Sequence, residues 1–320
     1  MADEILKTDI KGMLPRELEE YLRTLGQPAY RAKQVFSWLQ KGCGSFEEMS
    51  NLPAALRRTL SDNCHLYAPA VARKQISAQD GTIKYLWELC DGQAVETVLM
   101  RYRHGNTVCI STQVGCRQGC AFCASTIGGL VRNLRASEIL DEVLRFLELI
   151  NCPEGRNIGM RHISLSTCGI TERLDDLAAR DLQLTLSVSL HAPDDATRSR
   201  IMPANRGRGV DELFRKCSTY YEKTGRRISF EYAMIDGVND SAEQAELLAR
   251  RVKPLSAHVN LIPLNHVDER HFSPSTPENM RRFVEILEKN GGNVTVRRRL
   301  GSDVYASCGQ LRRKSMEGKI

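Results

Sequence analysis

The sequence lacks any apolar run long enough to cross a bilayer, and aromatic residues make up only 6% of it. A membrane-spanning helix needs about 20 consecutive apolar residues. Hydrophobic residues account for 42% of the 320 positions and charged residues for 26%, values typical of an ordinary soluble protein. The first 18 residues contain acidic side chains and lack the apolar core and small-residue cleavage site of a secretory signal. We therefore predict a cytoplasmic protein that makes no membrane contact.

The sequence also lacks the cysteine pattern of a disulfide framework. Its 11 cysteines are odd in number and scattered over a long chain, which fits poorly with a secreted scaffold. Three of them, Cys116, Cys120 and Cys123, form a CxxxCxxC triplet in GCRQGCAFCASTIGG. Three thiolates can hold all but one iron of a four-iron cluster, whereas an electron-transfer cluster normally has four cysteines. Structural zinc with a distant fourth ligand is the alternative, although such sites normally use paired spacings.

The net charge of +6 is modest, but arginine and lysine gather in short stretches at 206–208, 297–299 and 312–314. Local basic patches of this kind indicate a polyanionic partner such as RNA. The alternative is a solvated basic surface with no partner. Charge alone does not separate the two interpretations.

The chain predicts three regions of different character. Residues 14–60 contain three short amphipathic segments that end at Gly or are interrupted by Pro, a pattern typical of helices. Residues 83–101 alternate in polarity around Asp91-Gly92, which predicts a β-hairpin. We expect an N-terminal helical module of the RNA-binding type at 1–75, a β-hairpin linker at 76–105 and a catalytic domain at 106–320.

From residue 108 onward, strand-like and helix-like segments alternate. The expected strands are 108–116, 162–169, 183–191, 227–236, 258–265 and 293–298. The expected helices are 136–150, 172–180, 210–223, 241–252 and 277–290. Such alternation predicts an α/β fold with a parallel sheet and crossover helices. Polar residues end several strands, where barrel-like α/β folds build their sites, namely Ser166, Thr167, Ser189, His191, Glu231 and Asn265.

Several motifs in the same order resemble the RlmN family, which belongs to the radical S-adenosylmethionine (SAM) superfamily and methylates carbon 2 of adenine in 23S rRNA and tRNA. The resemblance covers nearly the whole chain and is carried by VETVLMRYRHGNTVCISTQVGC, GCAFCASTIGGLVRNL, RHISLSTCGI, SVSLHAPDDATRSRIMPAN, FEYAMIDGVNDS, HVNLIPLN and SCGQLRRK. It implies a partial (β/α) barrel. It also implies a [4Fe–4S] cluster on the cysteine triplet, with SAM on the open iron as the source of a radical.

The resemblance also implies roles for three further residues. Cys308 would carry a methyl group to the base, and Cys109 would close a transient disulfide with Cys308 to release the product. Glu96 would accept a proton from the substrate. Without the resemblance, Cys308 would be interpreted as a structural cysteine and Glu96 as a solvent-facing strand residue. The remaining six cysteines are assigned to packing: Cys43, Cys64, Cys90, Cys152, Cys168 and Cys217.

Five residues match family positions that contact SAM: Ser166, Ser189, Leu190, His191 and Asn265. Taken alone, each could equally serve local turn or cap chemistry, and a lone histidine is more often structural than a ligand. The arginine-rich tail around Cys308 suits phosphate contacts that position RNA while a base is extruded. The implied partners are 23S rRNA, tRNA and an electron donor such as flavodoxin or ferredoxin, and we expect a monomer.

One family motif is absent. Members carry a strand that ends in Gly-Glu-Pro and binds the amino group of SAM, but here 136–150 runs from the start of the first barrel helix into the end of the second. The junction lies near Val143 to Arg145, so one strand-helix unit is missing. The loss raises the alternative of a catalytically impaired RNA-binding relative. Methylation at adenine carbon 8 is a closer alternative, which the N-terminal module and SCGQL disfavour.

Overall fold

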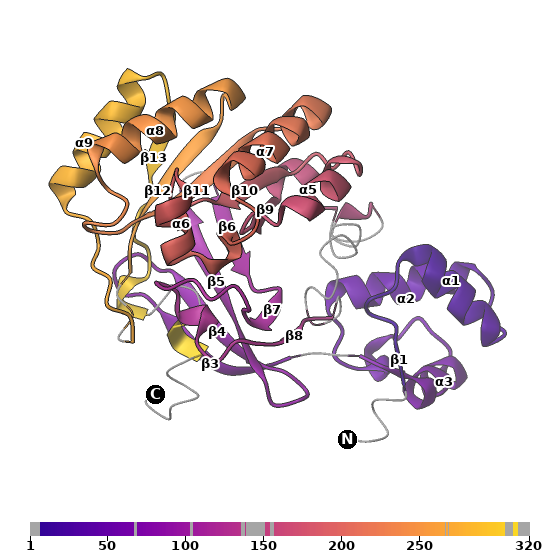
Figure 1. Ribbon diagram of the computed structural model, residues 1–320. Helices are drawn as coiled ribbons and strands as arrows, with labels where there is room; N and C mark the ends of the chain where they lie inside the picture. The colour runs from indigo at the N-terminus through magenta and orange to yellow at the C-terminus, as the bar shows by residue number, and fades with distance from the viewer. Residues whose placement is uncertain are drawn as a thin grey trace. The chain divides into compact units, whose positions relative to one another are not determined.

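The computed structural model describes residues 7–66, 69–102, 105–135, 138, 151–153, 157–265, 267, 269–304 and 310–312 (Figure 1). The chain divides into two compact units. The first comprises 1–75, 84–114 and 131–159, and the second comprises 76–83, 115–130 and 160–320. None of the described helices is long and apolar enough to cross a membrane. The division of the chain near 75 and 105 stays a prediction.

The first unit begins with the predicted helical module. Its helices are α1 (Pro15–Thr24), α2 (Tyr30–Lys41) and α3 (Ala54–Asn63), with a 3-10 turn at Phe46–Glu48. Leu18 and Leu22 of α1 lie one turn apart and are buried against Phe36 of α2 and Leu60 of α3. Two short strands, β1 (Thr8–Asp9) and β2 (Cys64–His65), pair in parallel beside this core. The helices predicted for this region are confirmed.

A four-stranded sheet completes the described part of the first unit. Its order is β3-β4-β5-β6, with bounds Ala70–Ile76, Ile83–Glu88, Ala94–Tyr102 and Gly105–Ile110. The predicted hairpin turn is confirmed, because Gly92 has φ +75° and the Leu89 amide donates to the Gln93 carbonyl at 2.8 Å.

The segment 108–116 differs from its prediction, which placed it in the parallel sheet. β6 pairs antiparallel with β5, and β7 (Gln113–Gly115) pairs with β8 (Leu130–Asn133). Only two residues separate β5 from β6. So short a connection allows antiparallel pairing, whereas a parallel crossover needs a dozen residues or more.

The second unit contains a parallel sheet of five strands in the order β13-β12-β11-β10-β9. From β9 to β13 the strands are Ser164–Thr167, Thr185–Ser189, Ile228–Met234, His258–Pro263 and Asn293–Val296. The connecting helices are α5 (Thr171–Ala178), α6 (Asp195–Ile201), α7 (Val210–Thr224), α8 (Ala242–Val252) and α9 (Pro277–Lys289). Leu186 and Phe230 from the sheet share one core with Leu213 and Phe283 from the helices. The predicted α/β class is confirmed.

Strand β9 forms one edge of the parallel sheet. In the part of the chain that the structure describes, β10 is its one hydrogen-bonded neighbour, with Ser166 opposite Ser187. Ser164 and Ser166 are exposed, whereas the central strand β11 is buried along most of its length. The predicted helix 136–150 and its junction at 143–145 lie outside the described residues, apart from Glu138. The strand expected to be missing would be a neighbour of β9.

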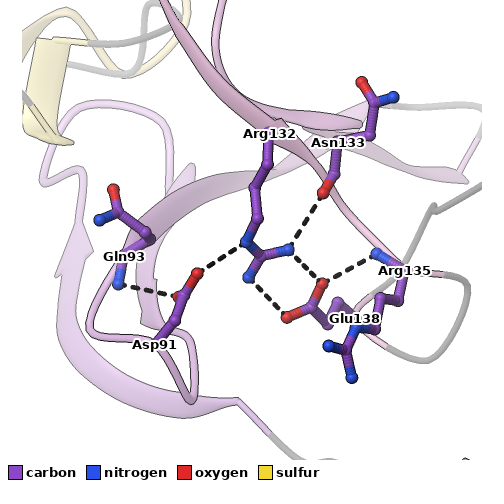
Figure 2. A network of polar contacts seen from close by, with 6 residues as sticks. All are labelled: Asp91, Gln93, Arg132, Asn133, Arg135 and Glu138. Carbon is purple, nitrogen blue, oxygen red and sulfur yellow. Dashed lines mark hydrogen bonds and ion pairs between the residues drawn. The ribbon is translucent and has the colours of Figure 1, made fainter.

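A network of ion pairs joins β8 to the hairpin turn of the first unit (Figure 2). The Arg132 guanidinium lies 2.7 Å from an Asp91 oxygen and 2.6 Å from an oxygen of Glu138, which also accepts from the Arg135 amide. The Glu138 side chain is 1% exposed. Hydrogen bonding to Arg132 lowers the pKa of the Asp91 carboxyl. Arg132 therefore fixes the chain that leaves the cysteine loop.

Replacing Arg132 by Met leaves the Glu138 carboxylate buried and unpaired. We expect the free energy of unfolding to fall by about 3 kcal/mol, as is typical when one partner of a buried pair is removed. Urea denaturation followed by circular dichroism measures the loss. Arg173→Met is the control, because its pair with Asp176 is largely exposed and such pairs contribute little. Equal losses in the two variants would contradict this account of Arg132.

Candidate active site

The cysteine loop spans 115–130 between β7 and β8, and its two ends are held together. The Cys116 amide donates to the Gly129 carbonyl at 2.9 Å. Gly115 has φ +78°, and a Cβ there would lie 2.1 Å from the Gly129 oxygen. The Thr126 hydroxyl reaches the carbonyls of Cys120 and Cys123 at 3.2 and 3.0 Å. The loop is therefore a closed and internally bonded turn.

The three cysteines of the loop lie close enough for their charges to interact. Burial raises the pKa of the Cys120 thiol to about 12, and the neighbouring Cys123 and Cys116 add to the rise. Such thiols resist ionisation unless a cation compensates them, as a metal does by binding the thiolate. Soft sulfur ligands on a partly open loop suit an iron–sulfur cluster. The donor chemistry therefore suits a [4Fe–4S] cluster. Among the described residues no three metal-ligating side chains form a site for a single ion, and ligation of the cluster by Cys116, Cys120 and Cys123 stays a prediction.

The cysteine loop packs against α6 and the carboxyl ends of the parallel strands. The Ala121 amide donates to the Ile201 carbonyl at 2.9 Å. Cys120 and Phe122 pack on an apolar cluster that contains Ile201, Ala233 and other residues of the second unit. Iron held by the loop would therefore lie at the edge of the sheet where polar residues were predicted to gather.

His191 lies against the cysteine loop in a conformation that is unusual for a histidine. Its φ is +58°, and its ring meets Phe122 edge-on at 5.0 Å between centroids. Nδ1 accepts a hydrogen bond from the Ala233 amide at 2.9 Å. Burial lowers the pKa of His191 to about 3, with a smaller contribution from the charge of Arg198. The ring is therefore neutral near pH 7, with its proton on Nε2.

The other predicted SAM contacts lie at or near the carboxyl ends of β9, β10 and β12. Ser189 is the last residue of β10, and the buried Leu190 follows it and donates its amide to the Glu231 carbonyl at 3.0 Å. Ser166 on β9 and Asn265 beyond β12 are both exposed. Since the strands are parallel, these residues share one edge of the sheet with His191. Their contact with SAM stays a prediction.

Glu96 and Cys109 lie on neighbouring strands of the first unit. Cys109 pairs with Val98, two residues from Glu96, so their side chains share a face of the sheet. Glu96 is buried and lies 3.1 Å from the fully buried Lys84 ammonium. The sequence analysis missed Lys84, because nothing in IKYLWE distinguishes it from a solvated lysine. Cys308 lies outside the described residues.

Known proteins match this chain over nearly its whole length. Residues 8–66 match the model of the ribosomal RNA large subunit methyltransferase N-terminal domain. The probable dual-specificity RNA methyltransferase RlmN of Desulforamulus reducens is 46% identical over 96% of this chain and 97% of its own. The probable dual-specificity RNA methyltransferase RlmN of Alkaliphilus oremlandii is 44% identical over 97% of this chain and 99% of its own. The chain belongs to the RlmN family.

A solved structure agrees with this assignment. The crystal structure of a radical SAM methyltransferase from Sphaerobacter thermophilus is 39% identical, with a TM-score of 0.90 over 95% of this chain and 98% of that one. The RlmN family uses SAM and a [4Fe–4S] cluster, in agreement with the donor set of the cysteine loop.

The RlmN relatives also bear on the missing strand-helix unit. The alignment with the Desulforamulus protein has 338 positions, whereas 96% of this chain is about 307 residues, so about 31 positions lack a residue here. Eight strand-helix units of a complete (β/α) barrel take about 250 residues, which is about 31 for each unit. The agreement in size supports the loss of one unit, and its location at 143–145 stays a prediction.

Gly115→Ala would test the closure of the cysteine loop. We expect a loss of about 1 kcal/mol from the positive φ and a further loss of roughly 1–3 kcal/mol because the Gly129 carbonyl must move. Gly128→Ala is the matched control, since it has φ +88° and nothing within 4 Å of the added Cβ. Chemical denaturation of both variants gives the difference. Equal losses would mean that the close approach to Gly129 does not constrain the loop.

The neutral state of His191 predicts a dependence of stability on pH. Below the unfolded pKa of about 6.5 the unfolded chain binds a proton that the folded ring does not, so the free energy of unfolding falls by about 2 kcal/mol between pH 7 and 5. Asparagine tolerates positive φ, so His191→Asn should keep the backbone and lose this part of the slope. Urea denaturation at several pH values measures both proteins. Parallel slopes would refute the assignment.

Proposed function

We propose that this chain methylates carbon 2 of adenine in 23S rRNA and tRNA, in the cytoplasm, by a radical SAM reaction. The observation that carries the proposal is the contact of Phe122 in the CxxxCxxC loop with His191, which follows Ser189 and Leu190 at the carboxyl edge of the parallel sheet. In a member of the RlmN family, this contact supports a site in which the proposed metal ligands lie beside a residue that matches a SAM contact. SAM bound to the cluster supplies the radical when both are present.

The chain's own residues then have distinct roles. Cys308 receives a methyl group from one SAM. The radical that a second SAM would supply removes one hydrogen atom from that methyl, and the methylene carbon then bonds to carbon 2 of adenine. The adduct would lose one electron to the oxidised cluster as it loses its proton. Glu96 accepts the proton that leaves carbon 2, and the Lys84 ammonium, 3.1 Å away, holds the Glu96 side chain in place. Cys109 attacks the sulfur of Cys308, so that an S–S bond forms as the S–C bond breaks. The electron pair of the broken bond stays on the product carbon, which takes up a proton.

SAM would be held by backbone and polar groups at the sheet edge. Ser166, Ser189, Leu190, His191 and Asn265 are the proposed contacts. The Leu190 amide already donates to the Glu231 carbonyl, so the polar group that Leu190 could offer SAM is its carbonyl oxygen, which has a second lone pair beside the bond from Arg198. The neutral Nε2–H of His191 can donate a hydrogen bond to a carboxylate or hydroxyl group.

A second candidate function is an RNA-binding relative without SAM turnover. About 31 aligned positions lack a residue here, and β9 has one hydrogen-bonded neighbour among the described strands. Both observations agree with the loss of the strand that carries Gly-Glu-Pro, which holds the amino group of SAM in the family. The N-terminal module, matched over 8–66, is unaffected by that loss.

Anaerobic reconstitution with iron and sulfide separates the two candidates. We expect a brown protein that cleaves SAM under a low-potential reductant and methylates 23S rRNA fragments and tRNA. Mass spectrometry of the nucleosides distinguishes 2-methyladenosine from 8-methyladenosine. RNA binding without SAM cleavage or methylation would select the second candidate.

Cys308→Ala tests the carrier role within the same assay. We expect loss of RNA methylation, at least 100-fold, with SAM cleavage retained, because the alanine has no sulfur to carry the methyl group. Cys217→Ala is the matched control, since Cys217 lies buried in the core of the second unit. Methylation by Cys308→Ala at the wild-type rate would exclude the proposed role.

A further inference from the structure

Arg198 is a buried arginine of α6 whose side chain connects two strand ends. It is 1% exposed. Its Nε donates to the Leu190 carbonyl at 2.9 Å, and its Nη2 donates to the carbonyls of Cys168 and Ser189 at 2.8 and 3.2 Å. Three backbone carbonyls at the carboxyl ends of β9 and β10 are therefore satisfied by one guanidinium.

No carboxylate contacts this guanidinium among the described residues. Nη1 donates to the amide oxygen of Asn205 at 2.6 Å, and the Asn205 nitrogen in turn donates to Asp195. All direct acceptors of Arg198 are thus neutral. A buried cation without a paired anion is costly, and burial accordingly lowers the pKa of Arg198. The site therefore favours an additional negative charge.

Cys120 of the cysteine loop and Cys168, which follows β9, are the nearest groups to Arg198 that can become anions. As thiolates they would be the largest factors that oppose the effect of burial on Arg198. Burial raises the pKa of both thiols, so a thiolate beside Arg198 requires a bound metal. Cys120 and Cys168 pack on the same apolar cluster. The sequence analysis assigned Cys168 to packing, and the structure places that packing beside the cysteine loop. Three residues after Arg198, the Ile201 carbonyl holds the Ala121 amide of the loop. One short helix thus carries both the cation and an anchor of the loop.

We propose that Arg198 is the buried counter-charge of the iron–sulfur cluster, a positioning residue that favours its reduced form and fixes the adjoining SAM-binding strand ends. This inference rests on the proposed function, since it requires the cluster on Cys116, Cys120 and Cys123. Reduction adds one electron from an external low-potential donor to a cluster already ligated by three thiolates. A fixed positive charge in a poorly solvated site stabilises that added negative charge.

The test compares the reduction potential of the cluster in variants of the full chain. Wild type, Arg198→Met and Arg198→Lys are reconstituted anaerobically and titrated with dithionite without SAM, and the reduced cluster is followed by electron paramagnetic resonance. At the wild-type midpoint, we expect the ratio of oxidised to reduced cluster to rise about tenfold in Arg198→Met, a shift of about 59 mV for one electron. Arg198→Lys keeps the positive charge, so its midpoint potential should lie close to that of wild type.

Two controls keep the test decisive. Arg215→Met removes an exposed arginine of the same unit that pairs with Glu212, and it should leave the potential unchanged. Arg198→Gln is a second neutral variant that keeps hydrogen-bond donors, in case Met does not fold. If no neutral variant folds and binds iron, the role of Arg198 is architectural and the inference is overturned.

The remaining outcomes separate this inference from the proposed function. If wild type forms a cluster but Arg198→Met leaves the midpoint unchanged, the inference fails and the proposed function stands. If Arg198→Lys shifts the midpoint as far as Arg198→Met, the hydrogen-bond geometry and not the charge is responsible, and the inference fails. If wild type holds no iron–sulfur cluster, both fail.

Discussion

The hydrogen bonds from Arg198 to the ends of β9 and β10 are the constraint on which the candidate site depends. Parallel strands leave their last carbonyls without partners at the carboxyl edge, and buried carbonyls without partners are costly. The Arg198 guanidinium donates to the carbonyls of Cys168, Ser189 and Leu190, and Cys168 lies 30 positions from Arg198 in the sequence. The backbone at Ser189 and Leu190 is fixed as a result, and it leads directly into His191 beside the cysteine loop.

Much of the second unit could be predicted from the sequence, because its signals are local. The strand and helix periods gave boundaries close to those of β9 to β13 and of α5 to α9, apart from the short α6. The polar residues that end β10 and follow β12 also indicated the functional edge. The segment 108–116 was different: its apolar pattern suits either sheet, and the short connection to β5 decides the pairing.

The side-chain partnerships could not be predicted, because they depend on which strands become neighbours. Lys84 and Glu96 are 12 positions apart, and only the hairpin brings them within 3.1 Å. His191 looked like a ligand by its SLH context, but its Nδ1 is already used by the Ala233 amide. The sequence gives no sign that Arg198 is buried, because its burial depends on the hydrogen bonds of α6 to the sheet edge.

The contact between Gly115 and Gly129 has a consequence for how the protein acquires metal. The ends of the cysteine loop are joined by protein hydrogen bonds, and Thr126 bonds the carbonyls inside it. The loss of conformational entropy on closing the loop therefore occurs during folding, and it does not reduce the affinity for metal. The backbone of the loop is closed by protein contacts alone, so metal could bind to a scaffold that is already folded. In this respect the loop differs from a zinc finger, in which the metal and the fold must form together.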